Sequence, residues 1–120
     1  MYKEQIKDLQ VILEVAPTGV FDEDTINKAL NYSHDEMIIA WVQKFLNSLD
    51  HNVKLGKVKV IDDQSYIVEL SGKFDRATKE LLVYFQKEYG LIYGDEINVT
   101  AQLDRPAWKL IANYINYHNA

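Results

Sequence analysis

The turn TGVFDEDT at residues 18–25 returns as SGKFDRAT at 71–78 and as TAQLDRPA at 100–107. In each copy an apolar residue stands directly before an Asp, and a helical run of residues begins at that Asp. Each copy follows an earlier helical run that carries an apolar residue and then Gln, at Leu9-Gln10, Val42-Gln43 and Phe85-Gln86. Helix–turn–helix units that recur in this way predict a fold built by repetition.

The Asp in each copy stands where the N-cap of a helix is expected. A carboxylate at that position accepts hydrogen bonds from the free N–H groups of the first turn and complements the positive end of the helix dipole. The apolar residue before it can fold onto the first turn and fix the direction in which the chain enters the helix. The predicted caps are Asp22, Asp75 and Asp104, and the residues before them are Phe21, Phe74 and Leu103.

Hydrophobic spacing predicts five helices, over residues 3–15, 22–32, 33–49, 75–89 and 104–115. Ser33, with Glu36 three residues later, predicts a capping box for the third helix. Gly90 is expected to end the fourth helix in the left-handed conformation. Among the large aromatic residues, core positions are favoured over binding positions for Trp41, Trp108, Phe45, Phe74 and Phe85.

The period of the apolar residues changes between the third and fourth helices. Alternating apolar residues on both sides of a polar turn at residues 61–65 predict a β-hairpin. The interpretation is a single, mainly α domain over residues 1–120, a compact bundle of about five short helices built from helix–turn–helix repeats. Residues 1–33 are predicted to form an N-terminal partial repeat, and residues 34–120 a core with the hairpin inserted at about 53–71.

Composition restricts the classes of partner. The chain has 120 residues, a net charge of −5 and no cysteine. An acidic chain argues against nucleic acid or an anionic membrane as the main partner, and without cysteine neither disulfides nor thiolate metal sites can form. No apolar run approaches the length of a membrane span, and the N-terminus does not have the apolar segment of a signal peptide.

The order of these motifs resembles that of the peptidoglycan-binding-domain-like family, the small helical module of bacterial and phage wall hydrolases. The resemblance rests on VQKFLNSL at residues 42–49, GKFDRAT at 72–78, FQKEYGL at 85–91 and DRPAWKL at 104–110. It covers about residues 38–115 and departs from the family motifs in four places. Asp75 replaces a Gly, Ser71 an Asp, and Ala107 the Thr before Trp108. The second turn has Gly94 but lacks the second glycine of the pattern, with Ala101 and Gln102 in that region.

The resemblance implies a non-catalytic, carbohydrate-binding module that targets a phage endolysin or a bacterial wall hydrolase to peptidoglycan. The implied partners are the wall polymer and a catalytic domain in the same or a partner chain, with no cofactor, no nucleic acid and no membrane. The implied location is the bacterial cell wall. The alternative is a protein–protein interaction or phage structural module, cytoplasmic or in the virion, that keeps the fold without binding sugar.

Aromatic rings suit the faces of sugars because they combine apolar area with a polar edge. The candidate ligand-binding residues are therefore placed around the end of the fourth helix and two glycine turns, namely Tyr84, Tyr89, Tyr93, Gly72 and Gly94. No catalytic residue and no metal ligand is assigned, since no His-Glu-x-x-His spacing or nucleophile motif occurs. The chain is expected not to be an enzyme.

Overall fold

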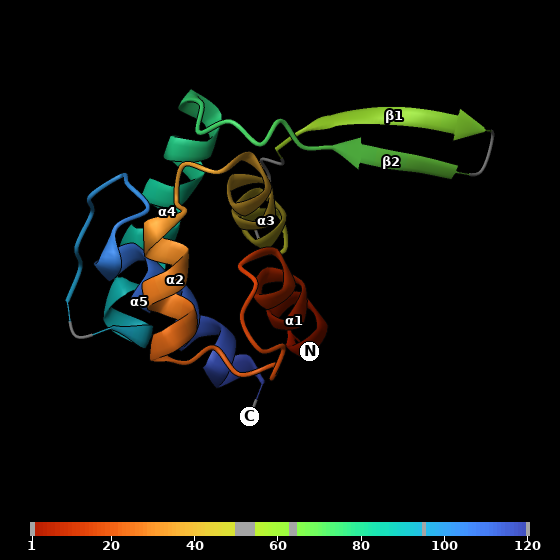
Figure 1. Cartoon of the computed structure of the whole chain (residues 1–120). Helices are drawn as coiled ribbons and strands as arrows, with labels where there is room; N and C mark the ends of the chain where they lie inside the picture. The colour runs from red at the N-terminus through yellow and green to blue at the C-terminus, as the bar shows by residue number, and fades with distance from the viewer. Residues whose placement is uncertain (1, 50–54, 63–64, 95, 120) are drawn as a thin grey trace.

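The computed structural model describes residues 2–49, 55–62, 65–94 and 96–119, and the backbone alone over most of the two strands. The chain is mainly helical. In order, the elements are α1 (Lys3–Ile12), α2 (Glu23–Asn31), α3 (Glu36–Asn47), β1 (Lys57–Asp62), β2 (Ser65–Glu69), α4 (Arg76–Tyr93) and α5 (Arg105–His118). The helices gather in one body, and the two ends of the chain lie together on one side of it (Figure 1). The backbone N–H of Tyr2 donates to Oδ1 of Asn119 at 2.7 Å.

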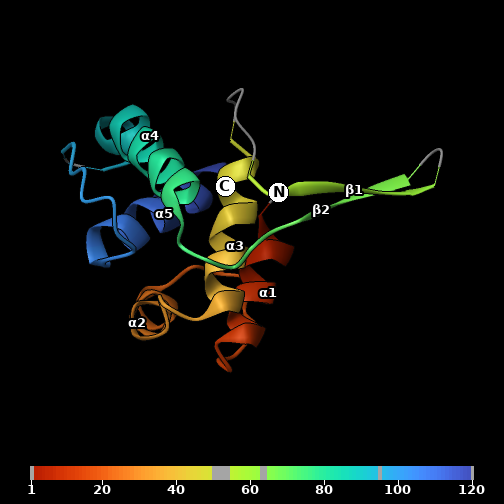
Figure 2. The same cartoon turned by 90° about the horizontal axis from the view of Figure 1, so that it is seen from above.

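The helices pack in pairs around α3 and α5. α3 lies against α1 on one side and α4 on the other, and α5 lies against α4 and α2 (Figure 2). β1 and β2 pair antiparallel, with Val58 opposite Val68 and Val60 opposite Tyr66, and they extend away from the helical body. The tip of the predicted hairpin, at Asp63 and Gln64, lies outside the described residues.

Aromatic side chains fill the centre of the bundle. Trp108, Phe45 and Phe85 are completely buried, and Trp41 is 7% exposed. The rings of Trp41 and Phe45 stack with their centroids 6.2 Å apart, and Phe45 meets Phe85 edge to face at 5.4 Å. Both indole nitrogens have partners, since Trp41 donates to the carbonyl of Gln5 and Trp108 to the hydroxyl of Ser33. Phe74 is partly buried against this core.

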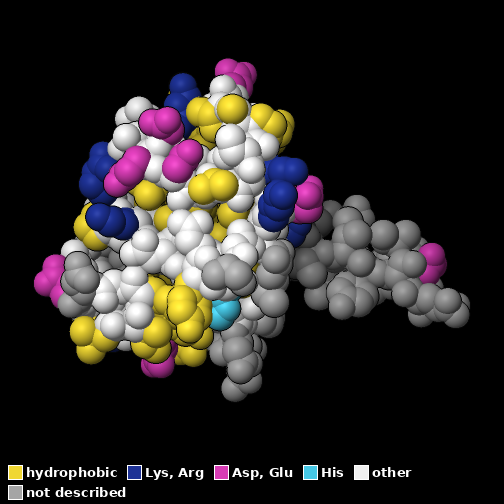
Figure 3. Space-filling model, turned by 90° about the horizontal axis from the view of Figure 1, so that it is seen from below, with side chains coloured by type: hydrophobic (Ala, Val, Ile, Leu, Met, Phe, Trp, Pro, Cys, Tyr) yellow, Lys and Arg dark blue, Asp and Glu magenta, His cyan; other side chains and the backbone are white. Residues whose placement is uncertain are grey.

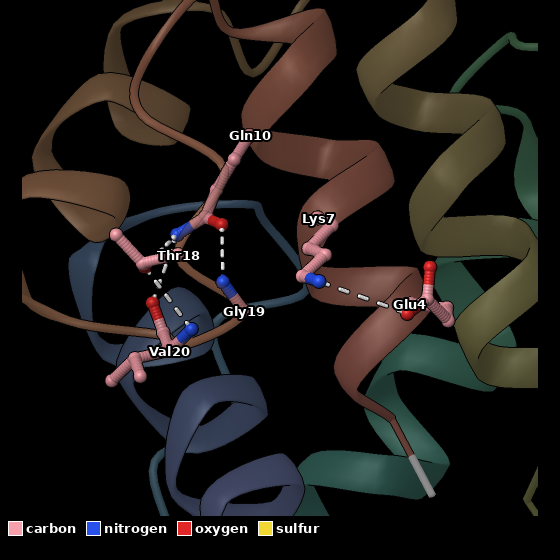
Figure 4. Close-up of polar contacts among 6 residues, drawn as sticks. All are labelled: Glu4, Lys7, Gln10, Thr18, Gly19 and Val20. Atoms are coloured by element: carbon pink, nitrogen blue, oxygen red, sulfur yellow. Dashed lines mark hydrogen bonds and ion pairs between the residues drawn. The ribbon is translucent and has the colours of Figure 1, made fainter.

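A buried glutamine holds each of the three turns. Nε2 of Gln10 donates to Thr18 and to the carbonyl of Val20, and its Oε1 accepts from the backbone N–H of Gly19 (Figure 4). Nε2 also donates to the hydroxyl of Thr25. Such a side chain replaces the backbone partners that a turn does not have. We call this arrangement the glutamine clamp.

The clamp recurs in full in the second turn and in part in the third. Gln43 donates to Ser71, to the carbonyl of Lys73 and to Thr78, and accepts from the N–H of Gly72. Gln86 donates to Thr100 and accepts from the N–H of Ala101. The repeat seen in the sequence is therefore a repeated hydrogen-bond unit, and α4 belongs to two of its copies.

The caps complete each unit. Asp22, Asp75 and Asp104 are the N-cap residues of α2, α4 and α5, and each carboxylate accepts from the backbone N–H three residues later. Asp22 and Asp75 also accept from the hydroxyls of Thr25 and Thr78, which are themselves bonded by the clamp.

The beginning of α3 differs from the prediction. Its N-cap is Asp35, which accepts from the N–H groups of Met37 and Ile38, and not Ser33. The Ser33 hydroxyl is buried, donates to the carbonyl of Ala29 and accepts from the indole of Trp108. The buried indole needs an acceptor more than the helix needs a second cap, because Asp35 supplies the cap two residues later.

The prediction for Gly90 was also wrong. α4 continues through it to Tyr93. A Cβ at Gly90 would lie 3.1 Å from the carbonyl oxygen of Glu96 and from Cα of Ile97. This glycine allows the loop after α4 to pass close to the helix, and the helix ends at Gly94, whose backbone is extended.

Asp75 gives the fold a dependence on pH. The hydroxyl of Thr78, followed by its backbone N–H, holds the pKa of the Asp75 carboxyl below its ordinary value of 3.8. A lowered pKa in the folded state contributes stability above the unfolded pKa, and this is lost as the pH falls through the folded pKa. The unaltered chain should therefore have a larger free energy of unfolding in urea than Asp75→Asn at pH 7. The two free energies should converge as the pH falls from 4 to 2.

The control for this prediction is Asp8→Asn. Asp8 is exposed on α1 and accepts no hydrogen bond from the described residues. Its replacement should give the same pH dependence as the unaltered chain. A constant difference between the unaltered chain and Asp75→Asn across the whole range would contradict the role assigned to the carboxylate.

Candidate functional site

A cluster of tyrosines covers one end of the molecule where α4 and α5 finish. Tyr114 is at its centre, with ring centroids 5.3 Å from Tyr89 and 5.0 Å from Tyr93. Burial raises the pKa of the Tyr114 hydroxyl, so this group stays neutral. The Tyr93 hydroxyl is 3.0 Å from Nε2 of His118, whose ring packs on Tyr114 at 4.3 Å. The view from below shows hydrophobic side chains gathered beside a histidine, and basic and acidic side chains over the adjoining surface (Figure 3).

A surface pocket of 540 Å³ lies beside this cluster, between the end of α4, the loop of residues 94–104 and α5. The lining residues come from these three segments and are Ile92, Tyr93, Gly94, Glu96, Asn98, Arg105, Pro106, Lys109, Leu110 and Asn113. We call it the α4–α5 pocket. It combines an aromatic ring, two carboxamides and charges of both signs.

The sequence explains why α5 forms one wall of this pocket. Arg105, Lys109 and Asn113 are spaced four residues apart and therefore share one face of the helix. Pro106 occupies the first turn, where a missing N–H has little cost. Nδ2 of Asn113 donates to the carbonyl oxygen of Tyr93 at 2.9 Å. This hydrogen bond connects the end of α4 to α5.

The opposite wall depends on the loop after α4. Its backbone can approach the helix because position 90 has no side chain, and the third glutamine clamp then holds Ala101 and Thr100. Glu96 and Asn98 are exposed on this loop. The loop wall is thus held near its start by the close approach to Gly90 and near its end by the hydrogen bonds of Gln86.

The predicted binding residues do not form one site. Tyr93 and Gly94 line the α4–α5 pocket. Tyr89 is half-buried between Phe85, Tyr93 and Tyr114, and Tyr84 is half-buried on α4 outside the pocket. Gly72 is buried just before the other end of α4, a helix about 27 Å long for its 18 residues.

A second pocket, of 460 Å³, lies near Gly72. Its lining comes from α3, the base of the hairpin and the start of α4, and includes Gln43, Lys57, Ser71 and Asp75. Gln43 and Ser71 are already bonded within the glutamine clamp, and Asp75 caps α4. Three of these four polar side chains are thus used by the fold, and the fourth, Lys57, is exposed at the base of the hairpin.

Several residues of the α4–α5 pocket were not among the sequence candidates. They are Ile92, Glu96, Asn98, Arg105, Lys109 and Asn113. The four-residue spacing on α5 was the available signal for three of them. The two loop residues gave no signal, because their position depends on how the loop returns to α4.

Comparison of the chain with protein-family models, curated proteins and solved structures finds no match. Within the described ranges, no helix is long and apolar enough to cross a bilayer. The same residues contain no group of three or more His, Asp or Glu side chains arranged to hold a metal ion.

Proposed function

We propose that this chain is a non-catalytic module that binds peptidoglycan and targets a bacterial or phage wall hydrolase to the cell wall. The observation that carries the proposal is the α4–α5 pocket. Its volume falls within the range of about 300–1,000 Å³ typical of small-ligand sites. The repeated motifs that resemble the peptidoglycan-binding-domain-like family support the same function.

The chemistry of the lining suits a wall polymer. The Tyr93 ring offers apolar area, the carboxamide of Asn98 can donate to and accept from hydroxyl, acetamido or peptide groups, and Oδ1 of Asn113 can accept from them. Lys109 forms no ion pair within the described part of the chain and is exposed. These groups are available to a ligand without breaking contacts of the fold.

The proposal is tested by cosedimentation with purified peptidoglycan sacculi. Ile92 is 66% exposed at the pocket, and Val11 is 62% exposed on α1, outside it. Ile92→Glu should weaken binding to sacculi about tenfold, since it places a charge where the ligand would cover an apolar side chain. Val11→Glu makes the same chemical change at similar exposure and should bind as the unaltered chain does.

The outcomes separate the function from its location. No binding of the unaltered, folded chain to sacculi would refute the proposed function. Equal binding by both variants and the unaltered chain would place the site elsewhere on the molecule.

A second candidate function is protein–protein interaction. It is favoured by apolar side chains exposed on and after the end of α4, which are Leu91, Ile92, Ile97 and Val99. Exposed apolar side chains that gather in one patch mark interaction surfaces in soluble proteins. Failure to bind sacculi, together with self-association that Ile92→Glu abolishes, would favour this function over the first.

A further inference from the structure

The charges of the α4–α5 pocket distinguish the two parts of a wall polymer. Two cations, Arg105 and Lys109, face the pocket together with one described carboxylate, Glu96. A glycan chain carries mostly hydroxyl and acetamido groups, which need no charged partner. A short peptide ends in a carboxylate and can carry a free amine, and each would find an opposite charge here.

Lys109 is the cation best placed to take a carboxylate. Arg105 is partly engaged, because its Nη1 lies 3.8 Å from Oε2 of Glu23 on α2. Both side chains of that pair are more than half exposed, so the pair contributes little to stability. Lys109 stands one helical turn further along α5, between Arg105 and Asn113.

The two carboxamides suit a peptide backbone. Asn113 lines the pocket and uses its Nδ2 to bond the carbonyl of Tyr93, so its Oδ1 is the atom left to accept a hydrogen bond from a ligand. Asn98, on the opposite wall, is exposed and makes no side-chain hydrogen bond within the described part of the chain. A peptide laid between them could both donate N–H and accept at C=O, the alternation that a backbone offers.

We infer that the α4–α5 pocket binds the peptide part of the wall polymer, with Lys109 bound to a peptide carboxylate and Glu96 to a peptide amine. This inference rests on the proposed function and specifies the chemical class that the pocket recognises. The chain's net charge of −5 favours such a zwitterion over a polyanionic secondary polymer, which the rest of the surface would repel.

The test is an NMR titration of the full chain with three soluble probes. They are the peptide L-Lys-D-Ala-D-Ala, its C-terminal amide, and the disaccharide of N-acetylglucosamine and N-acetylmuramic acid. The free peptide should shift resonances of the pocket residues. Loss of the carboxylate in the amide should weaken binding about tenfold, as should Lys109→Gln.

Lys87→Gln is the matched control, since Lys87 is exposed on α4 and does not line the pocket. It should bind the peptide as the unaltered chain does. Glu96→Gln should weaken binding of the free peptide. It should leave unchanged the binding of a peptide whose α-amine and side-chain amine are both acetylated.

Cosedimentation of the same variants with sacculi, with and without secondary polymers, separates this inference from the proposed function. The peptide assignment would be overturned if the chain binds sacculi but, of the soluble probes, only the disaccharide shifts the resonances of the pocket residues. It would also be overturned if the chain binds sacculi only when secondary polymers are present. Peptide and amide that bind equally would also overturn it. A chain that binds the peptide and does not bind sacculi would refute wall targeting while supporting the pocket chemistry.

Discussion

Gln43→Leu is expected to lower the free energy of unfolding by about 3 kcal/mol or more. Gln43 is 2% exposed and makes four hydrogen-bond contacts, in which the two hydrogens of its Nε2 are shared among three acceptors and its Oε1 accepts from one N–H. Leucine keeps much of the shape of the side chain and removes every one of these bonds. The buried N–H of Gly72 would then have no partner, and an unsatisfied buried group costs about 1–3 kcal/mol.

The three clamps should not be equally important. Gln10 also makes four hydrogen-bond contacts, so Gln10→Leu should cost about as much. Gln86 makes two described bonds, to Thr100 and Ala101, and its replacement should cost about half as much. The measurement is urea denaturation at pH 7 followed by circular dichroism.

Gln102→Leu is the control, because Gln102 is exposed on the loop that the third clamp holds. It should change the free energy of unfolding by less than about 0.5 kcal/mol. A Gln43→Leu protein that also falls within that range would show that the clamp does not contribute to stability.

The clamps show how much of the fold could be predicted from the sequence. The turn signals are local, since an apolar residue before Asp at the beginning of a helical run reports a cap within four residues. The recurrence of Gln was visible as well. Its role was not, because Gln43 and Gly72 are 29 positions apart and nothing local shows that they meet.

The candidate site was harder to predict for a similar reason. Tyr93 could be selected for its aromatic ring and Gly94 as a turn, since both follow the predicted fourth helix closely. The charged wall of the pocket comes from α5, and the loop wall depends on the close approach allowed by Gly90. That glycine resembles a helix C-cap in sequence, and only the packing of Glu96 and Ile97 against it shows its actual role.

The second large effect is expected from Gly72→Ala. In each repeat the residue whose N–H bonds the clamp has a positive φ: +76° at Gly19, +67° at Gly72 and +55° at Ala101. A side chain in this conformation costs roughly 1 kcal/mol. At Gly72 an added Cβ would also lie 2.7 Å from the backbone oxygen of Glu36, in the first turn of α3.

Neither partner in that contact can move freely. Glu36 is fixed by the cap of α3 at Asp35, and the turn is fixed by Gln43. Overpacking of this kind costs about 1–3 kcal/mol in addition to the conformational term. Gly72→Ala should therefore lose about 2–4 kcal/mol.

The other two copies of the turn provide matched comparisons for this effect. At Gly19 the nearest atom to an added Cβ is Cγ of the exposed Lys3, at 2.8 Å, and this side chain can rotate away. Gly19→Ala should thus lose only about 1 kcal/mol, the cost of the left-handed conformation. Ala101 already has that cost in the native chain, so Ala101→Gly should raise the free energy of unfolding by about 0.5–1 kcal/mol.

Urea denaturation of the three variants tests the series as a whole, because one conformational term is common to all of them. Equal losses for Gly72→Ala and Gly19→Ala would mean that the contact with Glu36 relaxes without cost. A destabilised Ala101→Gly protein would mean that the third turn does not adopt the left-handed conformation. The expected order, with Gly72→Ala least stable and Ala101→Gly more stable than the unaltered chain, requires both the shared turn geometry and the particular neighbour of each copy.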